Sequence, residues 1–162
     1  MAEQGDTATG TFVVTHADEA SAVLQDAETG QVHTLAENPG LERYDALQGR
    51  LEVEPPMAVV RSVAEVDRQW TVTVERSEET PTQQARKAAA GQAVGELTTR
   101  ERAGEGEVHV ITVPSGGTGE AAVDVVEDGA TLTRAARLGV GRVEVRATEA
   151  EDHGVVSVRY LP

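Results

Sequence analysis

One stretch constrains the fold of this chain more than any other, because it is almost continuously apolar and β-branched and ends at a proline. It reads Glu107-Val-His-Val-Ile-Thr-Val-Pro114. A short run of this kind, bounded by a turn signal, is typical of a strand that is buried on both faces. The Gly-rich segment 115–119 follows, and a helical pattern begins after it. We therefore expect a buried strand here, with one α/β layer organised around it.

Two helical patterns and then two strand patterns follow this run. A helical stripe extends over residues 120–138, and Asp128-Gly129 divides it into two helices. Two strand patterns, 142–147 and 154–161, are separated by a short polar turn and predict a hairpin.

A further helix is expected before the run. Residues 83–102 carry a thin Ala-rich stripe, and Thr80 or Thr82 is in place to cap the helix, with Pro81 in its first turn. The C-terminal half is therefore expected to be an α/β unit with the order helix, strand, helix, helix, strand, strand.

The N-terminal half has the pattern of a separate β unit. Residues 10–16, 21–26 and 31–35 alternate as strands with turn-like connections, which predicts a three-stranded meander. Three more strand patterns follow at 48–54, 59–66 and 70–76. Six short strands with a turn signal about every 10 residues favour a small barrel.

These patterns predict an α+β protein with an N-terminal small antiparallel β-barrel of the OB or SH3 type. The expected organisation is a loose tail over 1–9, the barrel over 10–77, a linker and connecting helix over 78–104, and the α/β unit over 105–162.

The segment Leu41…Asp45-x-Leu47-x-Gly49 in the barrel resembles the leucine–glycine–aspartate start of a strand in small RNA-binding barrels. Those barrels usually carry glycine before the aspartate, where this chain has Tyr44. A generic barrel turn has the same pattern, since such folds host many functions.

The balance of acidic and basic residues indicates the salt environment in which the protein works. The chain of 162 residues has 14 basic and 28 acidic residues, a net charge of −14, and Lys87 is its only lysine. Disorder and an acidic tail are alternatives, but the Val-rich alternation and the spread of the acids disfavour them. We favour a folded protein adapted to molar salt, where screening over about 3 Å makes net charge a weak argument against nucleic-acid binding.

Other features exclude whole classes of protein. Cysteine is absent, which excludes disulfides, thiol chemistry and Cys-ligated metals. The polar N-terminus has no signal-peptide core, and no apolar run approaches the ~20 residues of a membrane span. We expect a cytoplasmic protein with no membrane association.

The turn Gly116–Ala122 contains Gly117-x-Gly119-x-x-Ala122 between the strand and the helix. A dinucleotide pyrophosphate binds at such a place. However, Glu120 would lie beside the phosphate, and a flexible turn explains the glycines equally well.

The element order from 107 to 161 resembles the core of KH-type RNA-binding domains, which hold the backbone through a G-x-x-G loop between two helices. The corresponding residues here are Asp128-Gly129-Ala-Thr131, with one glycine and an acid.

Basic residues are relatively more frequent in the second half. Residues 1–81 have a net charge of −11, and residues 82–162 have −3. The candidate nucleic-acid-binding residues are Arg134, Arg137, Arg142, Arg146 and Arg159. Pairing of these arginines with the abundant carboxylates is the alternative.

Histidines are the candidate bases or metal ligands. His16 and His33 are expected to face each other across the meander, where Asp18 or Asp26 could join them in binding a metal, but no pair has i,i+4 ligand spacing. We predict no catalytic residue, no metal and no cofactor.

Several segments together resemble an uncharacterised family of haloarchaeal proteins, a domain of unknown function. They are Gly10-Thr-Phe-Val-Val-Thr-His-Ala-Asp18, Val32-His-Thr-Leu-Ala-Glu-Asn-Pro-Gly-Leu41, Glu54-Pro-Pro-Met57, Val108-His-Val-Ile-Thr-Val-Pro114 and Ser157-Val-Arg-Tyr-Leu-Pro162. The resemblance implies a salt-adapted archaeal cytoplasm and no particular activity.

Three functions stay open. The leading hypothesis is a non-enzymatic binding module for RNA or a ribonucleoprotein. The second is a protein–protein adaptor that uses the thin helix or an open sheet edge. The third is a nucleotide or small-molecule binder at the Gly116–Ala122 turn.

Overall fold

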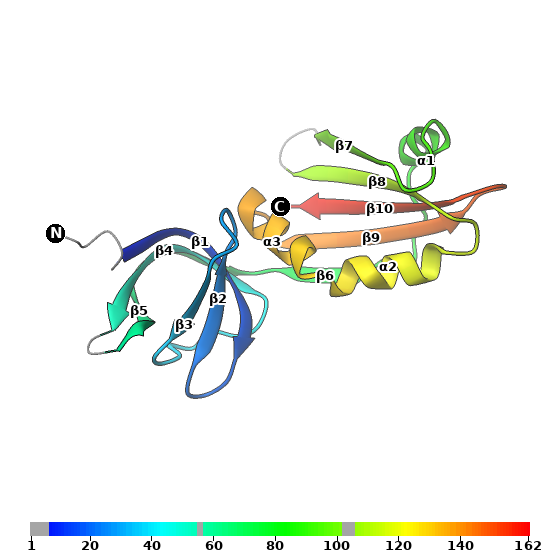
Figure 1. Cartoon of the computed structure of the whole chain (residues 1–162). Helices are drawn as coiled ribbons and strands as arrows, with labels where there is room; N and C mark the ends of the chain where they lie inside the picture. Colours follow the sequence, from blue (N-terminus) through cyan, green and yellow to red (C-terminus); the bar gives the residue numbers. More distant parts are fainter. Residues whose placement is uncertain (1–6, 55–56, 102–105) are drawn as a thin grey trace. The chain divides into compact units, whose positions relative to one another are not determined.

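The computed structural model describes residues 7–54, 57–101 and 106–162, and these residues form ten strands and three helices (Figure 1). The chain is therefore of the mixed α+β class, as its sequence predicts. The strands are β1 (Thr7–Ala17), β2 (Ala22–Asp26), β3 (Val32–Leu35), β4 (Asp45–Glu54), β5 (Met57–Thr71), β6 (Thr73–Arg76), β7 (Leu97–Glu101), β8 (Glu107–Val113), β9 (Arg142–Glu149) and β10 (Gly154–Leu161). The helices are α1 (Gln83–Ala90), α2 (Thr118–Glu127) and α3 (Gly129–Leu138).

The chain divides into two compact units, and each is described by itself. The first unit contains the residues up to Val72 together with Leu132–Gly139. The second contains Thr73–Thr131 and Val140–Pro162. The loose tail expected over residues 1–9 lies outside the described residues as far as residue 6, and β1 already begins at Thr7.

Five strands of the first unit pair in a closed ring, in the order β1-β2-β3-β5-β4 (Figure 1). The antiparallel pairs β1–β2 and β2–β3 confirm the predicted meander. Strands β3 and β5 are parallel and pair at Leu35 and Arg61, so the ring is not wholly antiparallel.

The core of the first unit comes from alternate residues of these strands. Phe12, Leu24, Leu35, Leu47 and Leu51 are each at most 1% exposed and belong to one cluster. Burial of a side chain of this size contributes about 1.5–3 kcal/mol, so this cluster is the main stabilising feature of the unit.

The start of β4 is fixed by the aspartate and glycine of the Leu41…Gly49 segment. The buried Asp45 carboxylate accepts hydrogen bonds from the Glu42 backbone N–H (3.0 Å) and the Thr71 hydroxyl (2.8 Å). A Cβ atom at Gly49 would lie 2.1 Å from the Glu65 carbonyl oxygen, at an irregularity in the β4–β5 register. Only glycine fits this close approach of two backbones.

The C-terminal part of α3 packs with the first unit. Arg137 Nη1 donates to the Ala27 carbonyl oxygen at 3.4 Å, and Arg68 Nη2 donates to the Gly139 carbonyl oxygen at 3.0 Å. The Arg68 guanidinium also lies 4.0 Å from the centre of the Trp70 ring. The hydrogen bond from Arg68 satisfies the Gly139 carbonyl, which lies just beyond the C-terminal end of α3.

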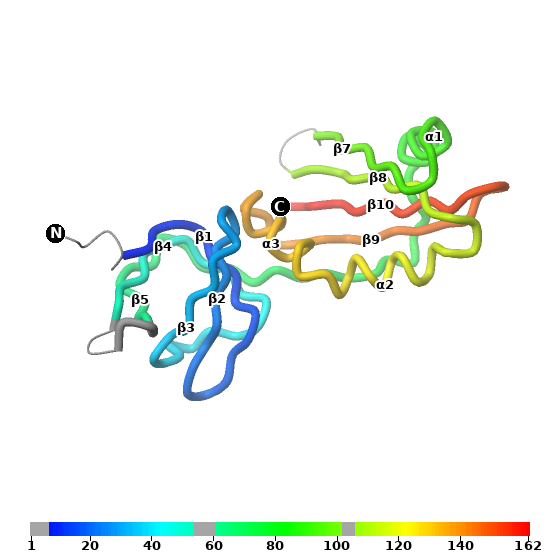
Figure 2. The backbone as a smooth tube through the Cα atoms, viewed as in Figure 1, coloured from blue at the N-terminus to red at the C-terminus, as the bar shows by residue number. Residues whose placement is uncertain are grey.

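The second unit contains a five-stranded sheet with the order β6-β9-β10-β8-β7 (Figure 2). The β9–β10 hairpin is confirmed. The strand predicted from the 107–114 run is β8, and its burial on both faces is confirmed by His109, Val110, Thr112 and Val113, which are at most 7% exposed. The central strand, however, is β10 rather than β8.

Helices α1 and α2 pack on opposite faces of this sheet. Ala89 of α1 belongs to a buried cluster with Val110 of β8 and Val155 of β10. Gly154, next to Val155, faces the other side, where an added Cβ would lie 2.4 Å from the Thr118 side chain of α2. The face of this sheet that α1 partly covers is called the α1 face below.

The predicted helix pair is confirmed, since α2 ends at Glu127 and α3 begins at Gly129. The helix expected over 83–102 is correct only in its first part. It begins after Thr82, whose hydroxyl accepts from the Ala85 N–H, and it ends at Ala90. The chain then turns through Gly95, with φ +93°, and enters β7 instead.

The strand pattern at 70–76 is also divided in the structure. Strand β5 extends to Thr71 in the first unit, whereas β6 pairs in parallel with β9 in the second sheet. The alternating pattern continues through the point where the chain passes from one sheet to the other, so local periodicity does not reveal the change.

Candidate functional site

A row of five residues crosses the α1 face, one from each strand of the second sheet. Arg100 lies opposite Val108, Val108 opposite Arg159, Arg159 opposite Glu144, and Glu144 opposite Glu75. Directly paired residues project from the same side of a sheet. The row therefore places charged side chains from four strands on one face, beside the part that α1 covers.

Glu144 is the centre of the charged network on this face. Its carboxylate Oε1 accepts from Arg146 Nε (2.7 Å) and Arg159 Nη1 (2.8 Å), and Oε2 accepts from Arg142 Nη2 (3.3 Å). Only 5% of Glu144 is exposed. Burial by itself raises the pKa of the Glu144 carboxyl, but the hydrogen bonds and charges of Arg146 and Arg159 outweigh it and hold that pKa below its usual value. The carboxylate thus stays ionised and orients three guanidinium groups.

Two of these arginines also reach outward. Arg146 Nη2 lies 2.9 Å from Glu79 Oε2, and Arg142 Nη2 lies 2.9 Å from Glu75 Oε1. The side chains of Glu79 and Glu75 are 70% and 47% exposed, so these outer pairs are weak and exchange readily with solvent or a ligand.

A pocket of about 350 Å³ adjoins the network on the α1 face. Its floor is apolar and contains Val108 and Val110 of β8. Its lining includes Arg159 of the network and Arg100 of β7. The pocket and the network therefore form one continuous candidate site on the open part of this face.

The comparison with protein families identifies the group to which the chain belongs. The model of DUF5812, described as a family of unknown function, matches residues 8–147. The chain belongs to this family. No curated protein and no solved structure matches it significantly. The resemblance to a family of unknown function is thus confirmed.

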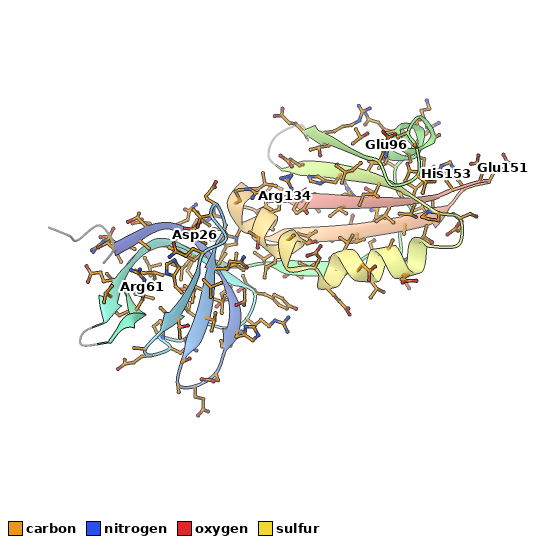
Figure 3. The ribbon with its side chains drawn as sticks, in the orientation of Figure 1. Asp26, Arg61, Glu96, Arg134, Glu151 and His153 are labelled. Carbon is orange, nitrogen blue, oxygen red and sulfur yellow. The ribbon has the colours of Figure 1, made fainter. Side chains whose placement is uncertain are left out.

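The five arginines predicted to bind nucleic acid fall into two groups in this DUF5812 protein. Arg142, Arg146 and Arg159 are brought together around Glu144 in the second unit. Arg134 (Figure 3) and Arg137 lie on the part of α3 that belongs to the first unit.

The Gly-rich turn before α2 binds a carboxylate of the protein itself. Glu149 Oε1 accepts from the Gly116 N–H (2.8 Å), and Oε2 accepts from the Thr118 hydroxyl (2.8 Å) and N–H (3.4 Å). The Gly116 hydrogen bond and then that of Thr118 lower the pKa of Glu149. The donors that a phosphate would need are therefore occupied, which disfavours nucleotide binding at Gly116–Ala122.

The histidines are not brought together in a metal site. His16 is exposed and pairs with Val23, whereas the buried His33 pairs with Leu24. The His33 and Phe12 rings lie edge to face, with their centres 5.6 Å apart. Because Val23 and Leu24 are adjacent on β2, the two histidines lie on opposite sides of the strands. Over the described ranges, no three His, Asp or Glu residues group as metal ligands.

Among the helices that the structure describes, none is long and apolar enough to cross a membrane.

Sequence reasoning missed Glu144 and Arg100. Glu144 is one of 28 acids, and its role follows only from the register of β9 with β10. The position of Arg100 on a strand was missed because its segment was expected to be helical. The alternation of Leu97-Thr-Thr-Arg-Glu101 is the weak local signal that could have indicated a strand.

Proposed function

We propose that this DUF5812 protein is a non-enzymatic binding module that holds RNA, or a ribonucleoprotein, against the α1 face of its second unit. The observation that carries the proposal is the gathering of Arg142, Arg146 and Arg159 on that face of an otherwise acidic chain. Arginine suits this role because its planar guanidinium pairs with phosphate oxygens.

Internal pairing leaves donors on Arg142 and Arg159. Arg146, by contrast, has all three nitrogens bonded within the protein, to Glu144, the Thr80 carbonyl and Glu79. A guanidinium has five N–H donors, and Arg159 uses one of them, Nη1, for Glu144. The Arg142 side chain is 49% exposed. Pairing with a buried carboxylate fixes the side chains in advance, which lowers the entropy lost when a ligand binds.

Two topological likenesses support RNA as the ligand class. The ring order β1-β2-β3-β5-β4 agrees with the expected OB-type barrel, a fold that often binds oligonucleotides. The order β8, α2, α3, β9, β10 agrees with the KH-like core. The Asp128 carboxylate accepts from the Ala130 N–H at the KH loop position, so we place RNA on the sheet face and not at that loop.

We further propose that the protein works in the salt-adapted cytoplasm of a haloarchaeon. At a net charge of −14, long-range repulsion would oppose RNA in dilute buffer. In molar salt the repulsion is screened within about 3 Å, and the local arginine contacts decide binding.

The test is fluorescence anisotropy of a labelled, random-sequence single-stranded RNA with the full chain in molar KCl. We expect saturable binding that Arg142→Gln weakens roughly three- to tenfold. The matched control is Arg50→Gln, since Arg50 also pairs with an exposed glutamate, Glu52, but lies on β4 of the first unit. Absence of binding, or equal loss in both variants, would contradict the proposal.

A protein–protein adaptor is the second candidate, and the edge of the second sheet favours it. Strand β7 pairs with β8, and β8 is its one neighbour among the described strands. Leu97 on β7 and Val94 just before it are 50% and 54% exposed. An extended peptide could add to such an edge. Partner capture that survives RNase and is lost in Leu97→Lys would favour the adaptor over the RNA module.

A further inference from the structure

The pocket on the α1 face has an apolar floor and a positively charged rim. Val108 is the partly exposed apolar residue of its lining, above Val110 and Ala85, which are 1% and 5% exposed, and Thr82 and Ser157 also line it. A volume of about 350 Å³ lies at the lower end of the range for small-molecule sites, which is roughly 300–1,000 Å³. The space therefore suits one small organic molecule.

Two arginines lie on either side of the floor. Arg100 and Arg159 are both opposite Val108 in register, one on each neighbouring strand. Their Cα atoms are thus two strand spacings apart, about 10 Å, and their side chains project from the same face. Two long guanidinium side chains at this separation can converge on one oxyanion above Val108.

Both guanidinium groups have donors available for a ligand. Arg159 is held on one side, where its Nη1 donates to Glu144, which leaves its remaining N–H groups for the pocket. Arg100 is exposed and makes no ion pair within the described part of the chain. Glu101 is the one acid among the lining residues, so the pocket is positively charged in a protein with 28 acids.

The first turn of α1 adds to this positive potential. The Thr82 cap lines the pocket, and the first turn contains no acidic residue. The positive end of the helix dipole favours an anion there, an effect smaller than that of the arginines.

We propose that this pocket binds a small organic anion, whose carboxylate or phosphate group lies between Arg100 and Arg159 and whose apolar body covers Val108. The head group forms charge-assisted hydrogen bonds with both guanidinium groups. The ligand displaces water from the apolar floor and leaves the Glu144–Arg159 pair intact. The inference goes beyond the proposed function, because it requires no RNA.

The test follows amide chemical shifts of the full chain during titration with phenyl phosphate, benzoate and inorganic phosphate. Phenyl phosphate and benzoate carry the same ring on different head groups, so their relative affinities identify the preferred oxyanion. We expect at least one of them to bind saturably, with shifts on β7, β8 and β10. Inorganic phosphate is expected to bind more weakly than phenyl phosphate, because it lacks the apolar body.

Matched variants locate the site. Arg100→Gln should weaken binding about tenfold. Arg86→Gln removes an exposed charge from the same α1 region but does not line the pocket, and it should leave the Kd unchanged.

No saturable shift with either ring compound, shifts confined to the first unit, or equal effects of the two variants would overturn the inference. The RNA test uses Arg142, which does not line the pocket, so either proposal can fail while the other holds.

Discussion

Among the residues that the structure describes, Tyr44 is the one residue other than glycine with a positive φ, at 79°. It precedes Asp45 at the position where small RNA-binding barrels usually carry glycine, the residue that adopts a positive φ without strain. A non-glycine residue in this region costs about 1 kcal/mol. The ring of Tyr44 recovers part of this cost, since the Arg43 guanidinium lies 4.7 Å from its centre.

Tyr44→Gly should therefore be more stable than Tyr44→Ala by about 1 kcal/mol, because both lose the ring and only glycine removes the strain. Urea titration of the two variants measures the difference in the free energy of unfolding. Equal stability of the two would show that the left-handed backbone is not strained.

The second prediction at this scale concerns Glu144. Glu144→Gln should lower the free energy of unfolding by about 2 kcal/mol at neutral pH, because Arg146 and Arg159 lose their ionised partner. The pKa of Glu144 is lowered in the folded protein, so its contribution is complete above the ordinary glutamate value of 4.5 and is lost as pH falls through the folded pKa.

The stability difference between the parent protein and Glu144→Gln should accordingly shrink as the pH is lowered below that value. Thermal denaturation across the acid range measures it. A difference that stays constant with pH would mean that the carboxylate charge does not stabilise the network.

At the scale of elements, Gly49 in β4 and Gly119 in α2 differ in the space available for a side chain. Gly49→Ala should destabilise the protein by at least about 2 kcal/mol, because the new Cβ would lie 2.1 Å from the Glu65 carbonyl oxygen and the β4–β5 pair must shift. Gly119→Ala is the control, since nothing lies within 4 Å of its Cβ position in α2, and it should stabilise by up to about 1 kcal/mol. Denaturation midpoints that move in the same direction would contradict this assignment.

The elements predictable from sequence were those with a local signal. The meander, the helix pair divided at Asp128-Gly129 and the β9–β10 hairpin have periodic patterns between turn residues, and all three are confirmed. The end of α1 and strand β7 were missed because Ala-rich residues continue to Ala93 and Val94. The pairing of β7 with β8 is a long-range effect that overrides helix propensity.

The candidate site was predictable only in part, for the same reason. Arg142, Arg146 and Arg159 were singled out from the charge distribution. Their convergence on Glu144 and the position of Arg100 beside Val108 depend on register across five strands, which composition does not determine.

At the scale of the whole molecule, the net charge of −14 predicts that salt stabilises the protein. The melting temperature should rise as KCl increases toward molar concentrations, because screening reduces repulsion among the carboxylates. Neutral sucrose at matched osmolality is the control for effects that do not depend on charge. A melting temperature that responds equally to both solutes would count against adaptation to salt.

Binding of RNA to the α1 face of the second unit is tested most directly by amide chemical-shift mapping with single-stranded RNA in molar KCl. We predict saturable shifts on β9 and β10 around Glu144, Arg146 and Arg159. Shifts confined to the first unit, or none at all, would contradict the proposal.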